Sequence, residues 1–218
     1  MQEKLLALGE EIKSHFPDVF SSIPHANDLP KNVYAHIKLR DAAKQITTRS
    51  YSTPQTYKEA WALLIQEHLD AGHIWPLNSQ HTFPAFLVPK ADKSEVPQWV
   101  NDYHILNSNI VLDAHPLPHV DDILTDCAKE KIWSKLDMIN SFFQTLVYPD
   151  DVSLTVVTTP FGLYEWVIMP MGLKNVPPIH QCQMTVALQQ YFAMCTLTML
   201  SSGLTIWKHT MTDNHTYI

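Results

Sequence analysis

Residues 134–144 read SKLDMINSFFQ, and residues 159–184 read TPFGLYEWVIMPMGLKNVPPIHQCQM. The first stretch is a short apolar strand that ends at an acid, Asp137, and continues into an aromatic segment. A carboxylate at a strand end can bind hydrated Mg²⁺, which takes one or two carboxylates together with phosphate oxygens. Because acids are also common helix caps and turn formers, Asp137 alone does not identify a metal site.

The second stretch predicts the end of a strand hairpin followed by a helix. Residues 152–159 and 163–169 are rich in β-branched and aromatic residues, and the turn PFG at 160–162 separates them. The proline pair at 177–178 favours a helix start, and we expect this helix to run to about Met194.

Residues 54–71 give the clearest helix prediction. Thr53 fits the N-cap and Pro54 the first helical position, while Gly72 is a natural stop. The apolar positions recur at helical spacing and form one face: Tyr57, Trp61, Leu64, Ile65 and Leu69.

Strand-like segments at 83–90 and 97–106 flank a polar turn, which predicts an antiparallel pair. We expect a further buried strand at 132–138. Shorter predictions are a helix at 2–16, an isolated strand VYAHIKL at 33–39 and a helix from about Pro118. This order is typical of an α+β fold, an antiparallel sheet with packed helices.

Composition sets broad limits. With 218 residues, of which 45% are hydrophobic, the chain can bury a core as one large domain or two lobes. No apolar run is long enough to cross a membrane, and we see no secretory signal. Three cysteines without pairing or metal spacing indicate an intracellular protein without disulfides or structural zinc. The net charge of −7 argues weakly against nucleic-acid binding.

Between Ser52 and Gln181, five ordered blocks resemble the reverse transcriptases of gypsy-type long-terminal-repeat retrotransposons. The blocks are LDAGHIWPLNSQHTFPAFLVPK (69–90), WVNDYHILN (99–107), LDAHPLPHVDDIL (112–124), SKLDMINSFFQ (134–144) and TPFGLYEWVIMPMGLKNVPPIHQCQM (159–184). The resemblance implies a right-hand polymerase, with a connector at 1–50, fingers and a partial palm at 51–195, and an aberrant tail at 196–218.

The resemblance also assigns site residues. Asp137 matches the first catalytic, metal-binding carboxylate, and Phe142 matches the aromatic gate that excludes a ribose 2′-OH. Lys90 matches a fingers lysine that contacts the incoming triphosphate, and Gln98 and Met171 occupy nucleotide-binding positions. Two alternatives without a function stay open. Phe142 can be an ordinary core residue, and Lys90 can be a solvent-exposed charge on the hairpin.

Two departures weaken the nucleotide site. Gln98 stands where the family usually has a triphosphate-binding arginine, and His104 stands where the pattern has arginine after the Asp-Tyr pair. Glutamine cannot reproduce the bidentate fork of a guanidinium group. We therefore expect poor nucleotide affinity even in an intact fold.

The tail lacks the family's second catalytic motif, Tyr-x-Asp-Asp. The family copies RNA or DNA templates with two Mg²⁺ ions, and such a pair needs about three carboxylates. After Glu165 this chain has one acid, Asp213, which comes too late in the sequence. The acid pairs at 121–122 and 150–151 read as a first helical turn and a turn before a strand, not as metal ligands.

A frameshift accounts for the missing motif. Suitable codons for Cys195 to His209, read after discarding two bases, give Tyr-Ile-Asp-Asp-Val-Val-Val-Trp-Ser-Asp. Met199 and Trp207 allow no choice of codon and still fit. A divergent tail in the original frame is the alternative.

The sequence therefore predicts a catalytically inactive fragment of an RNA-directed DNA polymerase, which does not bind Mg²⁺ productively. By resemblance its partners are an RNA or DNA template-primer and deoxynucleotide triphosphates. The alternatives are a residual nucleic-acid-binding module, in which aromatic and lysine side chains of the fingers hold a template, and a non-functional pseudogene product.

Overall fold

The computed structural model describes residues 10–11, 14–15, 24–77, 81–92, 95–116, 119, 121, 125, 128, 134–137, 140–188 and 204–207, with the backbone alone for 134–137, 187–188 and 204–207. Most of the expected N-terminal helix, most of the helix expected from about Pro118, the helix end beyond Leu188 and most of the tail lie outside these residues. No helix in the described part is long and apolar enough to cross a membrane.

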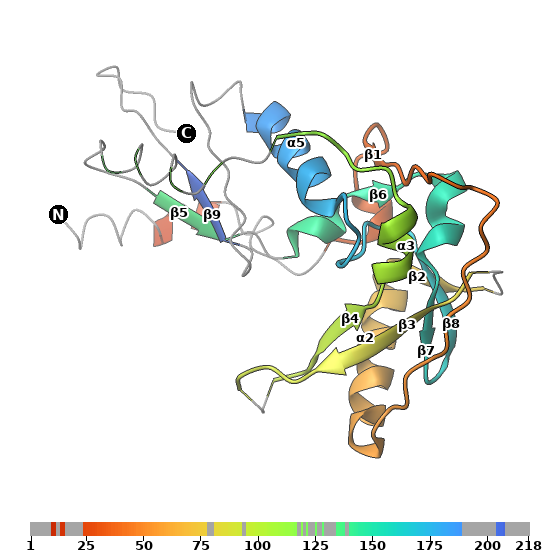
Figure 1. Ribbon diagram of the computed structural model, residues 1–218. Helices are drawn as coiled ribbons and strands as arrows, with labels where there is room; N and C mark the ends of the chain where they lie inside the picture. Colours follow the sequence, from red (N-terminus) through yellow and green to blue (C-terminus); the bar gives the residue numbers. More distant parts are fainter. Residues whose placement is uncertain are drawn as a thin grey trace, which may run out of the picture.

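Five strands form the main sheet, in the order β2-β8-β7-β3-β4 (Figure 1). Their bounds are β2 Ile74–Pro76, β3 Phe83–Val88, β4 Gln98–Asn101, β7 Val157–Thr159 and β8 Gly162–Trp166. The predicted pairing of β3 with β4 is confirmed and antiparallel. The α+β class is also confirmed, but β3 and β7 run parallel, so the sheet is not wholly antiparallel.

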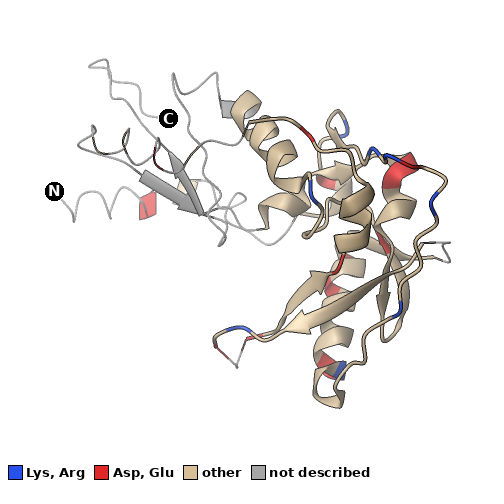
Figure 2. Cartoon of the chain, in the orientation of Figure 1, with Lys and Arg blue, Asp and Glu red and all other residues tan. Residues whose placement is uncertain are grey.

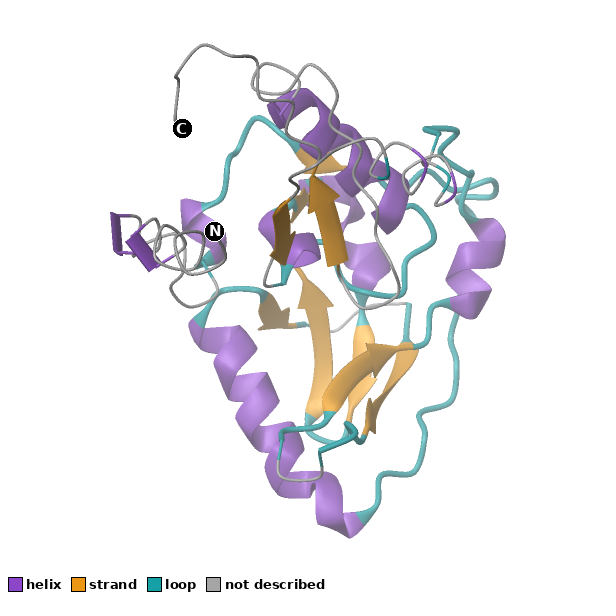
Figure 3. Cartoon of the chain, turned by 90° about the vertical axis from the view of Figure 1, so that its left-hand side faces the viewer, coloured by secondary structure: helices purple, strands orange, loops and turns teal. Residues whose placement is uncertain are grey.

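Helix α2 (Lys58–Asp70) lies along one face of this sheet (Figure 3). Trp61 is fully buried, and its ring meets that of Trp99 at a centroid distance of 4.7 Å. The helix is preceded by a 3-10 turn, η2 (Gln55–Tyr57), whose N-cap is Pro54. The expectation that Thr53 caps the helix is therefore wrong. The predicted stop is confirmed, because Gly72 adopts a φ of 67°.

The prediction of a strand at 152–159 is wrong for its first half and confirmed for its second half. Residues Pro149–Thr155 form a 3-10 helix, η4, and only β7 is extended. The Thr155 hydroxyl donates to the carbonyl of Trp166 (2.9 Å) and accepts from its N–H (2.9 Å). This side chain replaces the ladder bonds that a longer strand would make, so the strand starts later than its β-branched residues suggest.

The predicted strand at 97–106 also ends early. It stops at Asn101, and α3 (His104–Asn109) follows. The Asp102 carboxylate accepts a hydrogen bond from the His104 backbone N–H at 3.2 Å. Such a bond from an acid to the backbone two residues on favours a turn over an extended chain.

The segment before α2 packs into the same core as the sheet. A 3-10 turn, η1 (Ala26–Asp28), precedes β1 (Tyr34–Ala35), which pairs in parallel with β6 (Leu146–Val147). The expectation of an isolated strand is therefore wrong. Ile37 and Ile46 are also buried in this core.

The motif SKLD forms β5 (Ser134–Asp137), as predicted. It pairs antiparallel with β9 (Leu204–Trp207), a strand within the tail. A 3-10 turn, η3 (Ser141–Gln144), follows β5, and α5 (Val176–Leu188) begins one residue before the proline pair.

Candidate nucleotide and nucleic-acid site

Two of the predicted nucleotide-binding residues lie together. The Gln98 side-chain amide at the start of β4 points at the Met171 sulfur, with Nε2 3.9 Å from Sδ. Gln98 is exposed and Met171 is half-buried. The fold thus joins positions 73 residues apart in the sequence.

Asparagine side chains hold the loop that carries Met171. Asn101 donates to the Met171 carbonyl at 3.3 Å, and Asn107 donates to the Gly172 carbonyl at 2.8 Å. Asn107 also accepts from the Lys174 backbone N–H at 2.8 Å. Gly172 has a φ of 101°, and a Cβ there would lie 2.8 Å from the Asn101 carbonyl oxygen. The loop therefore has a fixed path that requires glycine.

Lys90 lies just beyond the end of β3, on the connection that leads back to Gln98. Its Nζ is 2.8 Å from Glu95 Oε2, and both side chains are about half exposed (48% and 54%). An exposed pair of this kind contributes little to stability, so an anionic ligand could displace Glu95 at small cost. The position of Lys90 is compatible with both alternatives from the sequence, a contact to the triphosphate and a solvent-exposed charge on the hairpin.

Phe142 sits in η3, half-buried against the core. Its ring faces that of His180 on α5, edge to face, at a centroid distance of 5.4 Å. His180 is buried, and this burial lowers the pKa of its imidazole to about 4, which keeps it neutral at pH 7. A neutral ring supports Phe142 without adding charge near it.

Asp137 is the last residue of β5, opposite Leu204. Its side chain lies outside what the structure describes. Among the described residues, no three His, Cys, Asp or Glu side chains form a group that could hold a metal ion. The described acids therefore do not fit a two-metal site.

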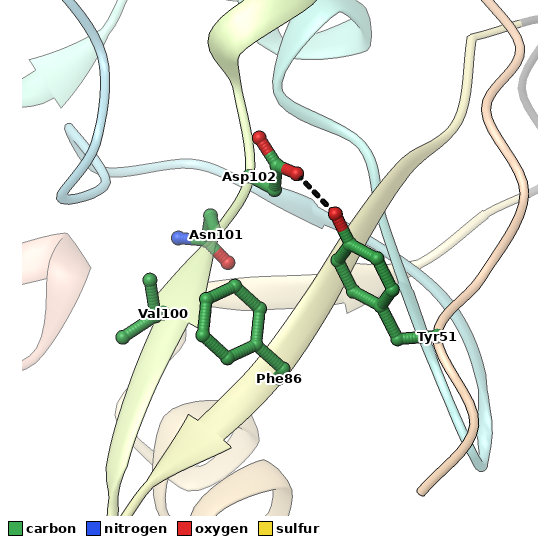
Figure 4. Close-up of a pocket in the computed structure, with 5 residues that line it drawn as sticks. All are labelled: Tyr51, Phe86, Val100, Asn101 and Asp102. Atoms are coloured by element: carbon green, nitrogen blue, oxygen red, sulfur yellow. Dashed lines mark hydrogen bonds between the residues drawn. The ribbon is translucent and has the colours of Figure 1, made fainter.

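The structure adds a hollow that the sequence did not single out. It is open, has a volume of about 550 Å³, and lies over β3 and β4 (Figure 4). Tyr51, 50% exposed, reaches over the sheet and donates its hydroxyl to Asp102 at 2.6 Å. Its ring meets that of Phe86 edge to face, with centroids 5.7 Å apart. Val100 and Asn101 complete the lining.

The hydrogen bonds at the rim fix the charge of the hollow. Burial raises the pKa of Asp102, but hydrogen bonds from Tyr51 and His104 outweigh it and leave this pKa below its ordinary value. The same bond to Asp102 raises the pKa of Tyr51. At neutral pH the hollow therefore carries the carboxylate of Asp102 and two aromatic rings, the protonated phenol of Tyr51 and the phenyl ring of Phe86. The sequence predicted the strand pair beneath the hollow, but neither its register, with Phe86 opposite Val100, nor the approach of Tyr51.

Comparison with known proteins points to one family. Residues 88–202 match the family model described as "Reverse transcriptase (RNA-dependent DNA polymerase)". This range includes Gln98, Asp137, Phe142 and Met171 and covers more than half of the chain.

Relatives by sequence come from plant viruses and insect transposons. The enzymatic polyprotein of Figwort mosaic virus (strain DxS) is 35% identical over 74% of this chain, and that of Cauliflower mosaic virus (strain Strasbourg) is 32% identical over 89%. The retrovirus-related Pol polyprotein from transposon 412 of Drosophila melanogaster is 29% identical over 82%. This chain spans only 24%, 30% and 15% of their lengths.

Solved structures with the same fold include a foamy viral protease-reverse transcriptase in complex with an RNA/DNA hybrid. It has a TM-score of 0.76 at 19% identity, and the match covers 96% of this chain and 27% of that one. A second structure of the foamy viral protein, in complex with double-stranded DNA, has a TM-score of 0.74 at 18% identity, covering 92% and 34%. These matches confirm the polymerase fold.

Proposed function

Because this chain belongs to the reverse transcriptase (RNA-dependent DNA polymerase) family, we propose that it is a piece of a retroelement polyprotein that no longer polymerises. The order and content of its five sequence blocks support the gypsy-type group within that family. In this proposal residues 1–50 are a connector, 51–195 are fingers and partial palm, and 196–218 are an out-of-frame tail. We place the protein inside the cell.

The observation that carries the proposed inactivity is the count of carboxylates. Reverse transcriptases normally use divalent metal ions, and two such ions need about three acidic ligands. Asp137 supplies one, and the sequence after Glu165 contains only Asp213. One carboxylate cannot hold the pair of ions that stabilises the attacking and leaving oxygens.

Primer extension tests this proposal directly. We expect no incorporation on a primed RNA or DNA template with Mg²⁺ or Mn²⁺, under conditions in which an active reverse transcriptase extends the same primer. Incorporation that disappears in Asp137→Ala would contradict the proposal, because it would show a working metal site. The coding DNA around Cys195 tests the frameshift separately.

A second function, nucleic-acid binding without chemistry, is supported by the hollow. Tyr51 and Phe86 offer ring surfaces on which bases can stack, and stacking contributes about 1–3 kcal/mol per base. Asp102 offers carboxylate oxygens as acceptors for base edges at the same place. The hollow can therefore hold unpaired bases of a template, while the substitution of Gln98 for arginine weakens triphosphate binding.

A gel shift with primed RNA at low salt tests this binding. We expect a shift that weakens several-fold in Tyr51→Ala and in Phe86→Ala. Phe161→Ala is the matched control, since that ring is 52% exposed at the tip of the β7–β8 hairpin and does not line the hollow. Equal losses in all three variants, or no shift in the parent chain, would contradict a template-holding role. A pseudogene product without a function would instead show a broad, non-cooperative melt.

A further inference from the structure

Two buried histidines join the end of α2 to the segment that precedes it in the chain. His68 Nδ1, on α2, lies 3.1 Å from His73 Nδ1, and His73 Nε2 lies 3.1 Å from the Pro24 carbonyl oxygen. The two imidazoles are 5% and 0% exposed. Solvent therefore does not reach this line of hydrogen bonds in the folded chain.

Residues 24–29, which contain η1 and are here called the entry segment, pack over the end of α2. The Ala26 N–H donates to the Ala71 carbonyl at 2.9 Å, beside the bond between His73 and Pro24. Ala26 and Leu29 are buried in the core. Beyond the entry segment, β1 is paired with β6, which holds the chain at that point.

The last acceptor of the line fixes the positions of the protons. A carbonyl oxygen only accepts, so His73 Nε2 carries the hydrogen that bonds Pro24. A neutral imidazole has one N–H, so His73 Nδ1 has a free lone pair and accepts from the N–H at His68 Nδ1. Each histidine is therefore neutral and held in a single tautomer.

This arrangement has no place for a further proton. On His73 the proton would lie on Nδ1 and face the N–H of His68, so two donors would meet without an acceptor. On His68 it would put a charge among aromatic rings of the core, which is unfavourable. Because His73 has no exposed surface, its protonated form is stable only after the entry segment has moved away and admitted water.

The groups around the pair do not compensate a charge there. Burial lowers the pKa of His73 and outweighs the Pro24 carbonyl, which raises it. Two titratable groups have smaller effects on this pKa: His25 of the entry segment lowers it, and Glu67 of α2 raises it. Figure 2 shows the acids of α2 in red, while much of the sheet beside it carries no charge. The sheet and η3 face the pair with aromatic rings, those of Trp99, Trp166 and Phe143.

We propose that the histidine pair is a proton-sensitive latch: a proton bound at His73 releases the entry segment from the end of α2 while the sheet stays folded. Release uncovers the imidazole of His73 and the apolar side chains of Ala26 and Leu29, and the β1–β6 pair limits how far the opening extends. Opening takes up a proton, so it is favoured as the pH falls below 6.5, the ordinary pKa of histidine.

Residue-resolved hydrogen exchange of the full chain tests the latch. The Ala26 N–H reports release of the entry segment, and the Met169 N–H, which donates to the Thr145 carbonyl at 2.8 Å, reports opening of the core. From pH 7 to pH 5 the protection factor of Ala26 should fall several-fold, since each unit by which burial lowers the pKa of His73 is worth up to about tenfold. At both pH values Ala26 should be less protected than Met169 and insensitive to low urea, because local release exposes little surface.

Variants assign the proton to one histidine. His73→Gln keeps an N–H for the Pro24 carbonyl but does not titrate, so the protection of Ala26 should no longer depend on pH. His68→Leu leaves His73 able to titrate, so Ala26 should keep its pH dependence. His119→Gln, at an exposed position, should behave as the parent chain does.

The outcomes separate local release from unfolding of the whole chain. Equal protection of Ala26 and Met169 at each pH, with the same urea dependence, would show a single global opening and overturn the latch, even where His73→Gln does not fold. Protection of Ala26 that does not change with pH in the parent chain would also overturn it. A pH dependence that persists in His73→Gln would assign the proton to another group and contradict our proposal.

Discussion

Individual residues at the junction of β4 and the loop 170–175 decide whether the candidate site can form. Asn101 binds the Met171 carbonyl, and Gly172 passes so close to Asn101 that a side chain has no room. The contact between Gln98 and Met171 depends on this close passage. The site is therefore sensitive to a single methyl group at Gly172.

Gly172→Ala should destabilise the fold by about 1–3 kcal/mol, because alanine at a φ of 101° is strained and its Cβ meets backbone at 2.8 Å. Gly162→Ala is the matched control: its φ is 137°, but nothing lies within 4 Å of the added Cβ. Urea unfolding of both variants measures the difference. Equal losses would show that backbone strain alone matters and that the close approach to Asn101 does not.

At the scale of an element, α2 fixes the sheet through its buried side chains. Trp61 has no exposed surface, whereas Leu63, two residues on, is 64% exposed. His68 is buried among aromatic rings, and its Nδ1 lies 3.1 Å from Nδ1 of His73, which in turn bonds the Pro24 carbonyl through Nε2 at 3.1 Å. One face of α2 therefore packs against the sheet through Trp61 and is also joined to the segment before the helix through the hydrogen bonds of His68 and His73.

Trp61→Ala should cost about 3–5 kcal/mol, because it removes a fully buried ring and leaves a cavity beside Trp99. Leu63→Ala, on the exposed side of the same helix, should change stability by less than about 0.5 kcal/mol. Thermal unfolding checks both. A small effect at Trp61 would mean that α2 does not anchor the sheet.

The histidine pair predicts a loss of stability in acid. Burial lowers the pKa of His68 to about 4 and also lowers that of His73, so both bind protons more tightly in the unfolded chain. The free energy of unfolding therefore has its full value above pH 6.5 and decreases as the pH falls toward 4. For His68 this decrease is about 3 kcal/mol. Melting curves between pH 7.5 and 4.5 measure it.

His68→Leu should flatten this pH profile, and His119→Gln, at an exposed position, should leave it unchanged. A parent-like profile in His68→Leu would assign the acid sensitivity to other groups.

At the scale of the whole molecule, the tail strand β9 lies beside the strand that carries Asp137. The tail thus pairs with an edge that would otherwise expose unpaired backbone groups. It supplies no acid there, since Leu204 stands opposite Asp137. In our proposal, pairing of the strand survives while the metal site does not.

Restoring the inferred reading frame from Cys195 should bring back metal binding. The restored chain, with Tyr-Ile-Asp-Asp in the tail, should melt at a higher temperature in Mg²⁺ than without it, because a ligand that binds only the folded state stabilises it. The present chain should show no such shift. The increase should vanish when Asp137→Ala is added to the restored chain. A Mg²⁺-dependent shift in the present chain that needs Asp137 would contradict our count of ligands.

The sequence by itself determined the family, the α+β class and the elements with strong local signals. The β3–β4 pair, the stop of α2 at Gly72 and the start of α5 follow from alternation, a positive φ and a proline pair. Two local patterns gave wrong predictions. Thr53 does not cap α2, because a 3-10 turn precedes the helix, and residues 152–156 are not a strand, because the Thr155 hydroxyl bonds the backbone of Trp166 instead. The carboxylate count, on which the proposed inactivity rests, needs no structure.

Only the tertiary structure decided which distant residues meet. Tyr51 reaches Asp102 across 51 positions, and Gln98 reaches Met171 across 73. Only the tertiary structure shows that Ile37 and Ile46, in the segment before α2, are buried in the core. The physical reason is that helical and strand periods report which side of an element is apolar. They carry no information about which other element covers that side.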